Sequence, residues 1–114
     1  MDDELFNRKL LEKFPEIHDN FITYTSWQDG IQTGSTLIVE DVFDPFCKKA
    51  AMNKNTETVK RICEFVEECI CSNDYLEYTV IYIGFLEWLK SSPVPALVNG
   101  LLESSRKAYD ELIY

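Results

Sequence analysis

The chain has 114 residues, of which 46% are hydrophobic and 13% aromatic, with only four Gly and four Pro. This composition predicts one folded domain, residues 1–114, and excludes a disordered chain. Twenty acidic side chains against eleven basic ones give a formal net charge of −9. This charge argues against nucleic acid as a ligand, because phosphate binding needs a Lys/Arg surface.

The sequence also gives evidence on cellular location and on the state of the cysteines. No apolar run approaches the roughly 20 residues that span a bilayer, and the opening Met1-Asp2-Asp3-Glu4 lacks the features of a signal peptide. The four cysteines lack the C-x-x-C spacing of a zinc site, and three sit among apolar neighbours, as thiols do in a reducing compartment. We therefore expect a cytoplasmic protein with no membrane contact and no bound metal.

The first two predicted helices meet at a proline. The segment Asp3–Phe14 has apolar residues at helical spacing, with Asp2 or Asp3 as its N-cap. Pro15 ends this helix and can start the next, since proline suits a first helical turn. The buried stripe of the second helix is expected to be Ile17, Phe21, Tyr24 and Trp27.

A third helix follows a polar loop that ends at Gly34. Ser35 or Thr36 is expected to cap it, and its apolar positions continue to Ala50. Pro45 lies inside it, where proline imposes a kink or a break. The β-branched residues of 36–43 leave a strand open as the alternative.

The fourth helix has the clearest pattern. Asn55 or Thr56 caps it, it runs to Ser72, and its apolar side consists of Val59, Ile62, Cys63, Val66, Cys69 and Ile70. Asp74 and Glu77 then have the spacing of a capping box. The nearly apolar segment 75–89 has strong β propensity, but its length favours a helix buried on most sides.

A last helix is predicted from Pro95 to Ile113, although Gly100 weakens it by about 1 kcal/mol relative to Ala. Short connections between these segments favour an all-α fold, an antiparallel bundle of five to six helices or stacked helical hairpins.

The charges are sorted into blocks along the chain. Residues 14–47 contain six carboxylates and no Lys or Arg, and residues 62–89 contain six more. Between them lies a basic stretch from Lys48 to Arg61. A fold needs no such segregation, so the blocks suggest a partner of opposite sign, although acidity can also serve solubility alone.

No recognisable catalytic motif is present. His18 is the only imidazole, and its position near a helix start predicts a surface residue. The pairs Asp41/Asp44 and Glu64/Glu67 are three residues apart and can each share a helix face. A di-metal bundle would need Glu-x-x-His motifs, which are absent. We expect a solvated acidic face rather than an enzyme, with no cofactor.

Four segments resemble a known family. Phe14-Pro15-Glu16-Ile17, the loop ending at Gly34, the helix Thr56–Ser72 and the segment 83–89 (Ile-Gly-Phe-Leu-Glu-Trp-Leu) are similar to small, acidic, all-helical immunity proteins of bacteria. These proteins are encoded beside polymorphic toxins, including those of contact-dependent growth inhibition. The similarity extends from Leu5 to Tyr109, and Pro45 departs from it.

The resemblance implies a cytosolic protein that binds one cognate toxin domain and blocks it without chemistry of its own. Many such toxins are nucleases with basic grooves, and an acidic helical surface can occupy such a groove as a phosphate mimic. We favour an RNase over a DNase. The residues expected to contact the toxin are Glu40, Asp41 and Asp44 of the third helix, Glu64, Glu67 and Glu68 of the fourth, and the aromatic anchors Trp27 and Tyr75.

Two alternatives remain open. A helical adaptor for another basic protein or peptide would use the same surface, and a small enzyme or metal protein would use the acidic pairs. The oligomeric state also stays open between a monomer and a homodimer.

Overall fold

The secondary structure of the described residues is helical. The computed structural model describes residues 1–113, and no strand occurs among them. In chain order the α-helices are α1 (Asp3–Lys13), α2 (His18–Thr25), α3 (Ser35–Ile38), α4 (Asp44–Met52), α5 (Thr56–Ile70), α6 (Tyr75–Ile81), α7 (Glu87–Ser91), α8 (Pro95–Gly100) and α9 (Glu103–Glu111). The predicted all-α fold is confirmed, and the strand alternative for 36–43 is wrong.

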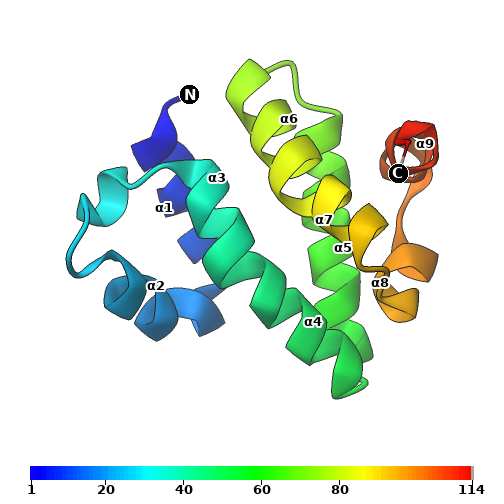
Figure 1. Cartoon of the computed structure of the whole chain (residues 1–114), viewed down its shortest axis with the longest axis horizontal. Coiled ribbons are helices and arrows are strands. Elements are labelled where there is room, and N and C mark those ends of the chain that lie inside the picture. The colour runs from blue at the N-terminus through cyan, green and yellow to red at the C-terminus, as the bar shows by residue number, and fades with distance from the viewer. Residues whose placement is uncertain (114) are drawn as a thin grey trace.

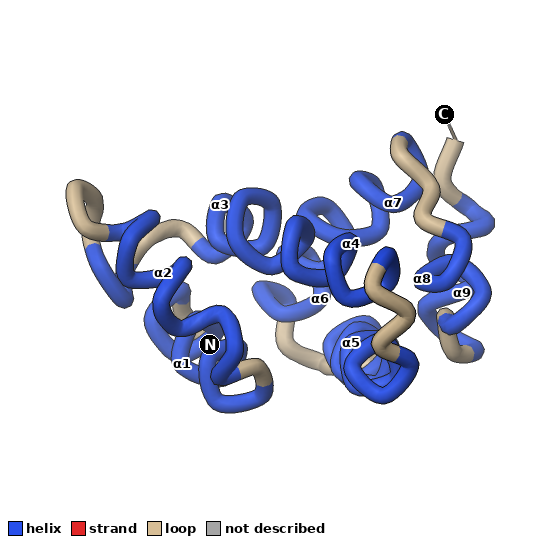
Figure 2. The backbone as a smooth tube through the Cα atoms, turned by 90° about the horizontal axis from the view of Figure 1, so that it is seen from below, coloured by secondary structure: helices blue, strands red, loops and turns tan. Residues whose placement is uncertain are grey.

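Successive long helices run antiparallel. In Figure 1 the rod made by α3 and α4 descends, α5 climbs back beside it, and the rod made by α6 and α7 descends again. Helices α1 and α2 lie on one side of these rods, and α8 and α9 lie on the other, as Figure 2 shows from below. None of the helices in residues 1–113 is both long and apolar enough to cross a membrane.

The first helix holds the loop that leads to the third. Asp2 caps α1 by accepting a hydrogen bond from the Leu5 N–H at 2.9 Å. The Asn7 side-chain amide donates to the carbonyls of Ile31 and Thr33, at 3.0 and 2.7 Å. These bonds satisfy backbone groups of an irregular segment that would otherwise be buried without partners.

The third helix starts differently from the prediction. Gly34 is its N-cap residue and makes no side-chain cap, while Ser35 is the first helical residue. The Ser35 N–H donates instead to the Asp3 carboxylate of α1 at 3.0 Å. A residue of another helix therefore supplies the cap that we expected from Ser35 or Thr36.

Pro45 is accommodated inside the third helix without a break. The turn before it, Val39–Phe43, is a π turn, in which the Asp44 N–H donates to the Val39 carbonyl five residues back. Proline has no N–H and its ring collides with the carbonyl four residues earlier in a regular helix. The wider π turn relieves that collision, so α3 and α4 form one continuous rod.

A second π turn lies opposite the first. Tyr82–Leu86 joins α6 to α7, with the Glu87 N–H donating to the Tyr82 carbonyl. The two π turns pack on one another, and a Cβ on Gly84 would lie 2.9 Å from Val39 Cγ1. A larger residue at this close approach would have to displace Val39. The predicted helix over 75–89 is confirmed, extended to Ser91.

The core lies where the rods meet α1 and α5. The Phe14 and Phe43 rings are 5.1 Å apart, and both pack on Phe65 at 5.5 and 5.9 Å. Burying large aromatic rings gives much of the hydrophobic stabilisation of a domain of this size. The apolar side of α5 is buried as predicted, apart from Val59, which is half-buried.

The predicted last helix is wrong, because the chain breaks at Leu101 and Leu102 into α8 and α9. Gly100 packs so closely on α5 that a Cβ would lie 2.8 Å from Cys63 Sγ. Just beyond it, the Glu67 carboxylate of α5 accepts hydrogen bonds from the N–H groups of Ser104 and Ser105. Contacts with α5 therefore end one helix and begin the next.

Candidate functional site

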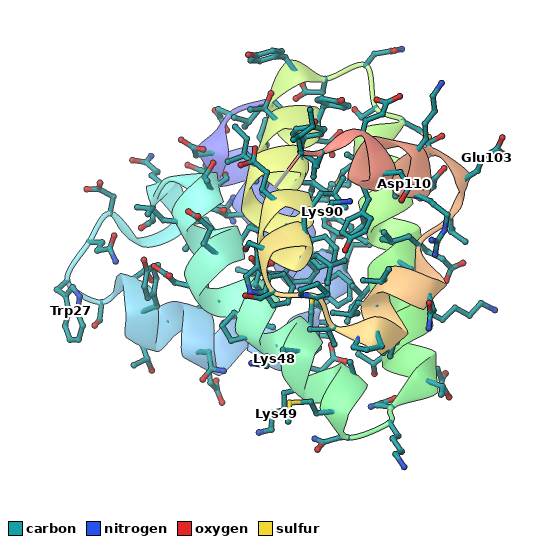
Figure 3. All side chains as sticks on the ribbon, turned by 45° about the vertical axis from the view of Figure 1, so that its right-hand side comes forward. Trp27, Lys48, Lys49, Lys90, Glu103 and Asp110 are labelled. Atoms are coloured by element: carbon teal, nitrogen blue, oxygen red, sulfur yellow. The ribbon has the colours of Figure 1, made fainter. Side chains whose placement is uncertain are left out.

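The eight residues expected to contact a partner do not form a single surface. Trp27 follows α2, and Glu40 and Asp41 lie on the π turn between α3 and α4. Tyr75 begins α6, which Figure 1 places well away from α2. Both aromatic residues are 82% exposed, and Figure 3 shows Trp27 projecting from the far end of the molecule. Trp27 is therefore not part of the buried stripe that we expected on the second helix.

Asp44 is the clearest correction to the predicted surface. Asp44 is only 1% exposed, and neither of its carboxylate oxygens has a hydrogen-bond partner within residues 1–113. Burial, with the nearby charges of Glu40 and Asp41, raises the pKa of Asp44 to about 9. The residue is therefore protonated at neutral pH and offers nothing to a partner. The π turn breaks the 3.6-residue period from which we placed Asp41 and Asp44 on one exposed face.

The acids of α5 are largely engaged within the protein. Glu67 caps α9, as described above. Glu68 forms ion pairs with Lys9 at 3.3 Å and Lys13 at 3.7 Å. Glu64 is exposed and borders a shallow hollow shared with Lys13 and Arg61. The local charge on this side of α5 is therefore mixed rather than uniformly negative.

A groove about 460 Å³ in volume lies between α2 and α4. One wall is a helical row of residues four apart, Glu16, Asn20 and Tyr24. The opposite wall is a second such row, Asp41, Pro45, Lys49 and Asn53, and the floor is Val42, Phe46 and Ala50. We call this feature the α2–α4 groove. Its apolar floor and polar walls are typical of ligand sites.

A carboxylate stands at each end of the α2–α4 groove. At one end the Tyr24 hydroxyl donates a hydrogen bond to Asp41 Oδ2. This hydrogen bond is the main reason that the pKa of Tyr24 is raised. At the other end Arg61 binds Glu16 through two nitrogens, at 2.6 and 3.0 Å, and these bonds lower the pKa of Glu16.

The start of α5 closes the Glu16 end of the groove. Asn55 caps α5 by accepting a hydrogen bond from the Thr58 N–H at 3.1 Å, and both residues line the groove. Thr58 is only 7% exposed, and its hydroxyl makes no hydrogen bond within the described residues. A hydroxyl that lines the groove and makes no hydrogen bond among the described residues can serve an incoming ligand.

Of the residues that line this groove, only Asp41 was among those predicted to contact a partner. Tyr24 was expected on the buried stripe of the second helix, and no role was predicted for Glu16 or Asn20. The four-residue period of a helix, applied to polar side chains, would have identified this row as one face of a helix. This row faces the row that begins at Asp41 only because the two helices pack against each other, and the sequence of neither helix shows that.

Outside the α2–α4 groove, few of the described side chains are suited to catalysis or metal binding. Cys47, Cys63 and Cys69 are buried and Cys71 is exposed, all as free thiols. Burial raises the pKa of Cys63 to about 11 and that of Cys69 to about 12, which leaves both thiols protonated and poorly nucleophilic. Within residues 1–113 no group of three or more His, Cys, Asp or Glu side chains is arranged to hold a metal.

Sequence comparison assigns most of the chain to one family. A family model described as "Domain of unknown function (DUF7674)" matches residues 7–114. No curated protein matches the chain, and no solved structure does.

Proposed function

We propose that this chain, which belongs to the DUF7674 family, is an immunity protein that binds a cognate bacterial toxin domain in the cytoplasm and neutralises it. A nuclease toxin, and an RNase before a DNase, suits the charge of the protein best. Nucleases hold phosphates with basic surfaces, and a protein of net charge −9 is attracted to such a surface before contact.

The observation that carries this proposal is the α2–α4 groove with its acidic end. Asp41 lines the groove, and Glu40 is exposed on the same π turn. Neither carboxylate forms an ion pair within the described residues, so both remain available to cations of a partner. Trp27, three residues beyond Tyr24, adds a large exposed aromatic side chain of the kind that anchors interfaces.

The proposed interface is therefore narrower than the acidic surface expected from charge blocks. It consists of α2, the turn Val39–Phe43 and α4. The acids of α5 are left out, because Glu67 caps a helix and Glu68 is paired with two lysines. Charge pairs satisfied within the protein contribute little to a partner, since breaking them offsets the gain.

Co-expression tests the proposal directly. The gene immediately upstream would be expressed alone and together with the gene for this chain, and growth of the host cells would be measured. We expect growth arrest by the upstream product alone and rescue by this chain, with a stable one-to-one complex on purification. Growth arrest without rescue, or an upstream product that is harmless, would contradict the proposal. Isolation of a different basic protein as the bound partner would instead identify an adaptor.

A further inference from the structure

The shape of the α2–α4 groove limits what can occupy it. Glu16, in the 3-10 turn Pro15–Ile17, and Tyr24, on α2, are eight residues apart along one wall, which corresponds to about 12 Å if the rise is close to that of an α-helix. About four residues of extended chain cover that distance at roughly 3.3 Å each. The volume of about 460 Å³ is also that of a site for a small ligand or short peptide rather than for a packed helix.

The polar groups of the groove suit a peptide backbone. Asn20 and Asn53 lie on opposite walls and make no side-chain hydrogen bond within the described residues. Each carboxamide offers donors and an acceptor, the same set that a peptide group presents. The hydroxyl of Thr58, which lines the groove and makes no hydrogen bond among the described residues, adds a third group. Asn20 lies on α2, Thr58 lies on α5, and Asn53 directly follows α4, so all three groups are positioned by helices before any ligand arrives.

The charges of the groove are arranged in a fixed order. Asp41 at one end is exposed, and the Tyr24 hydroxyl orients its carboxylate. Lys49 lies on the same wall, two helical turns further along. Glu16 at the far end is already neutralised by Arg61. The protein therefore attracts a ligand that carries one cation at the Asp41 end. A second cation on the ligand, near Lys49, would be repelled.

We propose that the α2–α4 groove binds an extended peptide segment, about four residues long, that places one Arg or Lys side chain against Asp41. The segment belongs to the partner, so this inference rests on the proposed function for the identity of that partner. Asp41 pairs with the cation, Tyr24 positions Asp41, and the carboxamides of Asn20 and Asn53 hold the backbone. The occupant is thus a basic extended segment rather than an amphipathic helix or a second copy of the chain.

A displayed library of random hexapeptides is the probe for this groove, selected against the purified full-length protein. We expect the selected peptides to carry a single Arg or Lys and to bind the Asp41→Asn variant at least tenfold more weakly, equivalent to about 1.4 kcal/mol. Asparagine keeps an acceptor for the Tyr24 hydroxyl and removes only the charge. Asn20→Ala, on the other wall, should weaken the same peptides.

Asp110→Asn provides the matched control, because Figure 3 shows Asp110 on α9, far from Trp27 and the lysines of α4. It removes the same exposed charge and should leave peptide affinity unchanged. Replacing the Arg of a selected peptide with uncharged citrulline should reproduce the loss seen with Asp41→Asn. Selection of acidic peptides, of none, or of peptides that bind both variants equally would overturn the inference.

The peptide selection does not depend on the toxin. If co-expression shows no rescue while the selection yields Asp41-dependent peptides, the groove is correct and the immunity function is wrong. If wild type rescues growth and the selection fails, the function stands and the groove proposal is overturned.

Discussion

Glu67 and Ser105 join α5 to the start of α9. The Glu67 carboxylate accepts a hydrogen bond from the Ser105 N–H at 2.9 Å and another from the Ser105 hydroxyl at 2.8 Å. A carboxylate at a helix N-terminus satisfies free N–H groups and interacts favourably with the helix dipole. Glu67, which we expected at a partner surface, therefore has a structural role that its position on a charged helix does not reveal.

We expect Glu67→Ala to lower the free energy of unfolding by about 1 kcal/mol, the usual loss for a helix cap. Glu64→Ala, the same change one turn earlier at an exposed position, should change it by less than about 0.5 kcal/mol. Urea unfolding of the three proteins at pH 7 measures both values. Equal losses in the two variants would show that the cap contributes nothing.

The cap also has a pH dependence. Partial burial alone would raise the pKa of Glu67, but hydrogen bonds from Ser105 and Ser104 lower it below the ordinary value of 4.5. The folded state thus binds the proton more weakly than the unfolded state. The stabilisation is present above the ordinary pKa and is lost as the pH falls through the lowered one, so wild type and Glu67→Ala should converge in stability in acid.

Asp44 predicts the opposite pH dependence. Its pKa is about 9 in the folded protein against an ordinary 3.8, so the folded state retains a proton that the unfolded state releases. Stability is then highest below about pH 4 and falls as the pH rises toward about 9. Asp44→Asn should remove this decline and stabilise the protein at pH 7 by a few kcal/mol, since one pKa unit is about 1.4 kcal/mol.

The control for Asp44→Asn is Asp19→Asn, because Asp19 is a fully exposed carboxylate on α2. Its effect on the free energy of unfolding should be within about 0.5 kcal/mol at every pH. Urea unfolding at several pH values from 4 to 9 gives the comparison. A wild-type decline that persists unchanged in Asp44→Asn would mean that Asp44 is not the group responsible.

Local sequence signals were sufficient for most of the fold. The caps at Asp2, Asn55 and Asp74 were among the predicted ones, and the apolar spacing located α1, α2 and α5. These features depend on residues within one or two turns of each other. The capping box was only half correct, because Glu77 does not reach back to Asp74 and instead accepts hydrogen bonds from Lys9 and Ser72.

What the sequence did not reveal depends on contacts between distant segments. The break between α8 and α9 is held by Glu67, 38 residues from Ser105. The burial of Asp44 follows from a π turn that Pro45 requires, and this turn changes which side chains face inward. The α2–α4 groove needs two helices to face each other. Periodicity within one helix carries no information about its neighbour.

Gly84 tests the contact between the two π turns. A Cβ at this position would lie 2.9 Å from Val39 Cγ1 and 3.1 Å from Val39 Cβ, so Gly84→Ala should destabilise the protein by about 1–3 kcal/mol through overpacking. Gly34→Ala is the matched control, because the nearest atom to its Cβ is Leu37 Cδ1 at 4.0 Å and its φ is −51°.

Thermal and urea unfolding of the two glycine variants would give the difference. Combining Gly84→Ala with Val39→Ala should recover part of the loss caused by Gly84→Ala, because the smaller residue removes the methyl groups in conflict. If Gly84→Ala and Gly34→Ala are equally stable, the two turns do not pack as closely as the structure indicates.

The last prediction separates the two acidic regions in toxin binding. Reversing Glu40 and Asp41 to Lys should slow association with the toxin at least tenfold at low salt, because exposed interface charges act mainly on the association rate. Reversing Glu64 and Glu68 to Lys changes the net charge by the same amount and should have a much smaller effect, because the proposed interface excludes α5. Stopped-flow kinetics at two salt concentrations measures both.

The difference in association rate between wild type and the Glu40/Asp41 reversal should decrease as salt is added. The Debye length falls from about 30 Å at 0.01 M to about 10 Å at 0.1 M, which screens the long-range attraction but not packing contacts. Circular dichroism would verify that both double variants remain folded. Equal slowing by the two reversals would mean that net charge alone governs encounter. The surface formed by α2, the turn Val39–Phe43 and α4 would then have no special part in recognition.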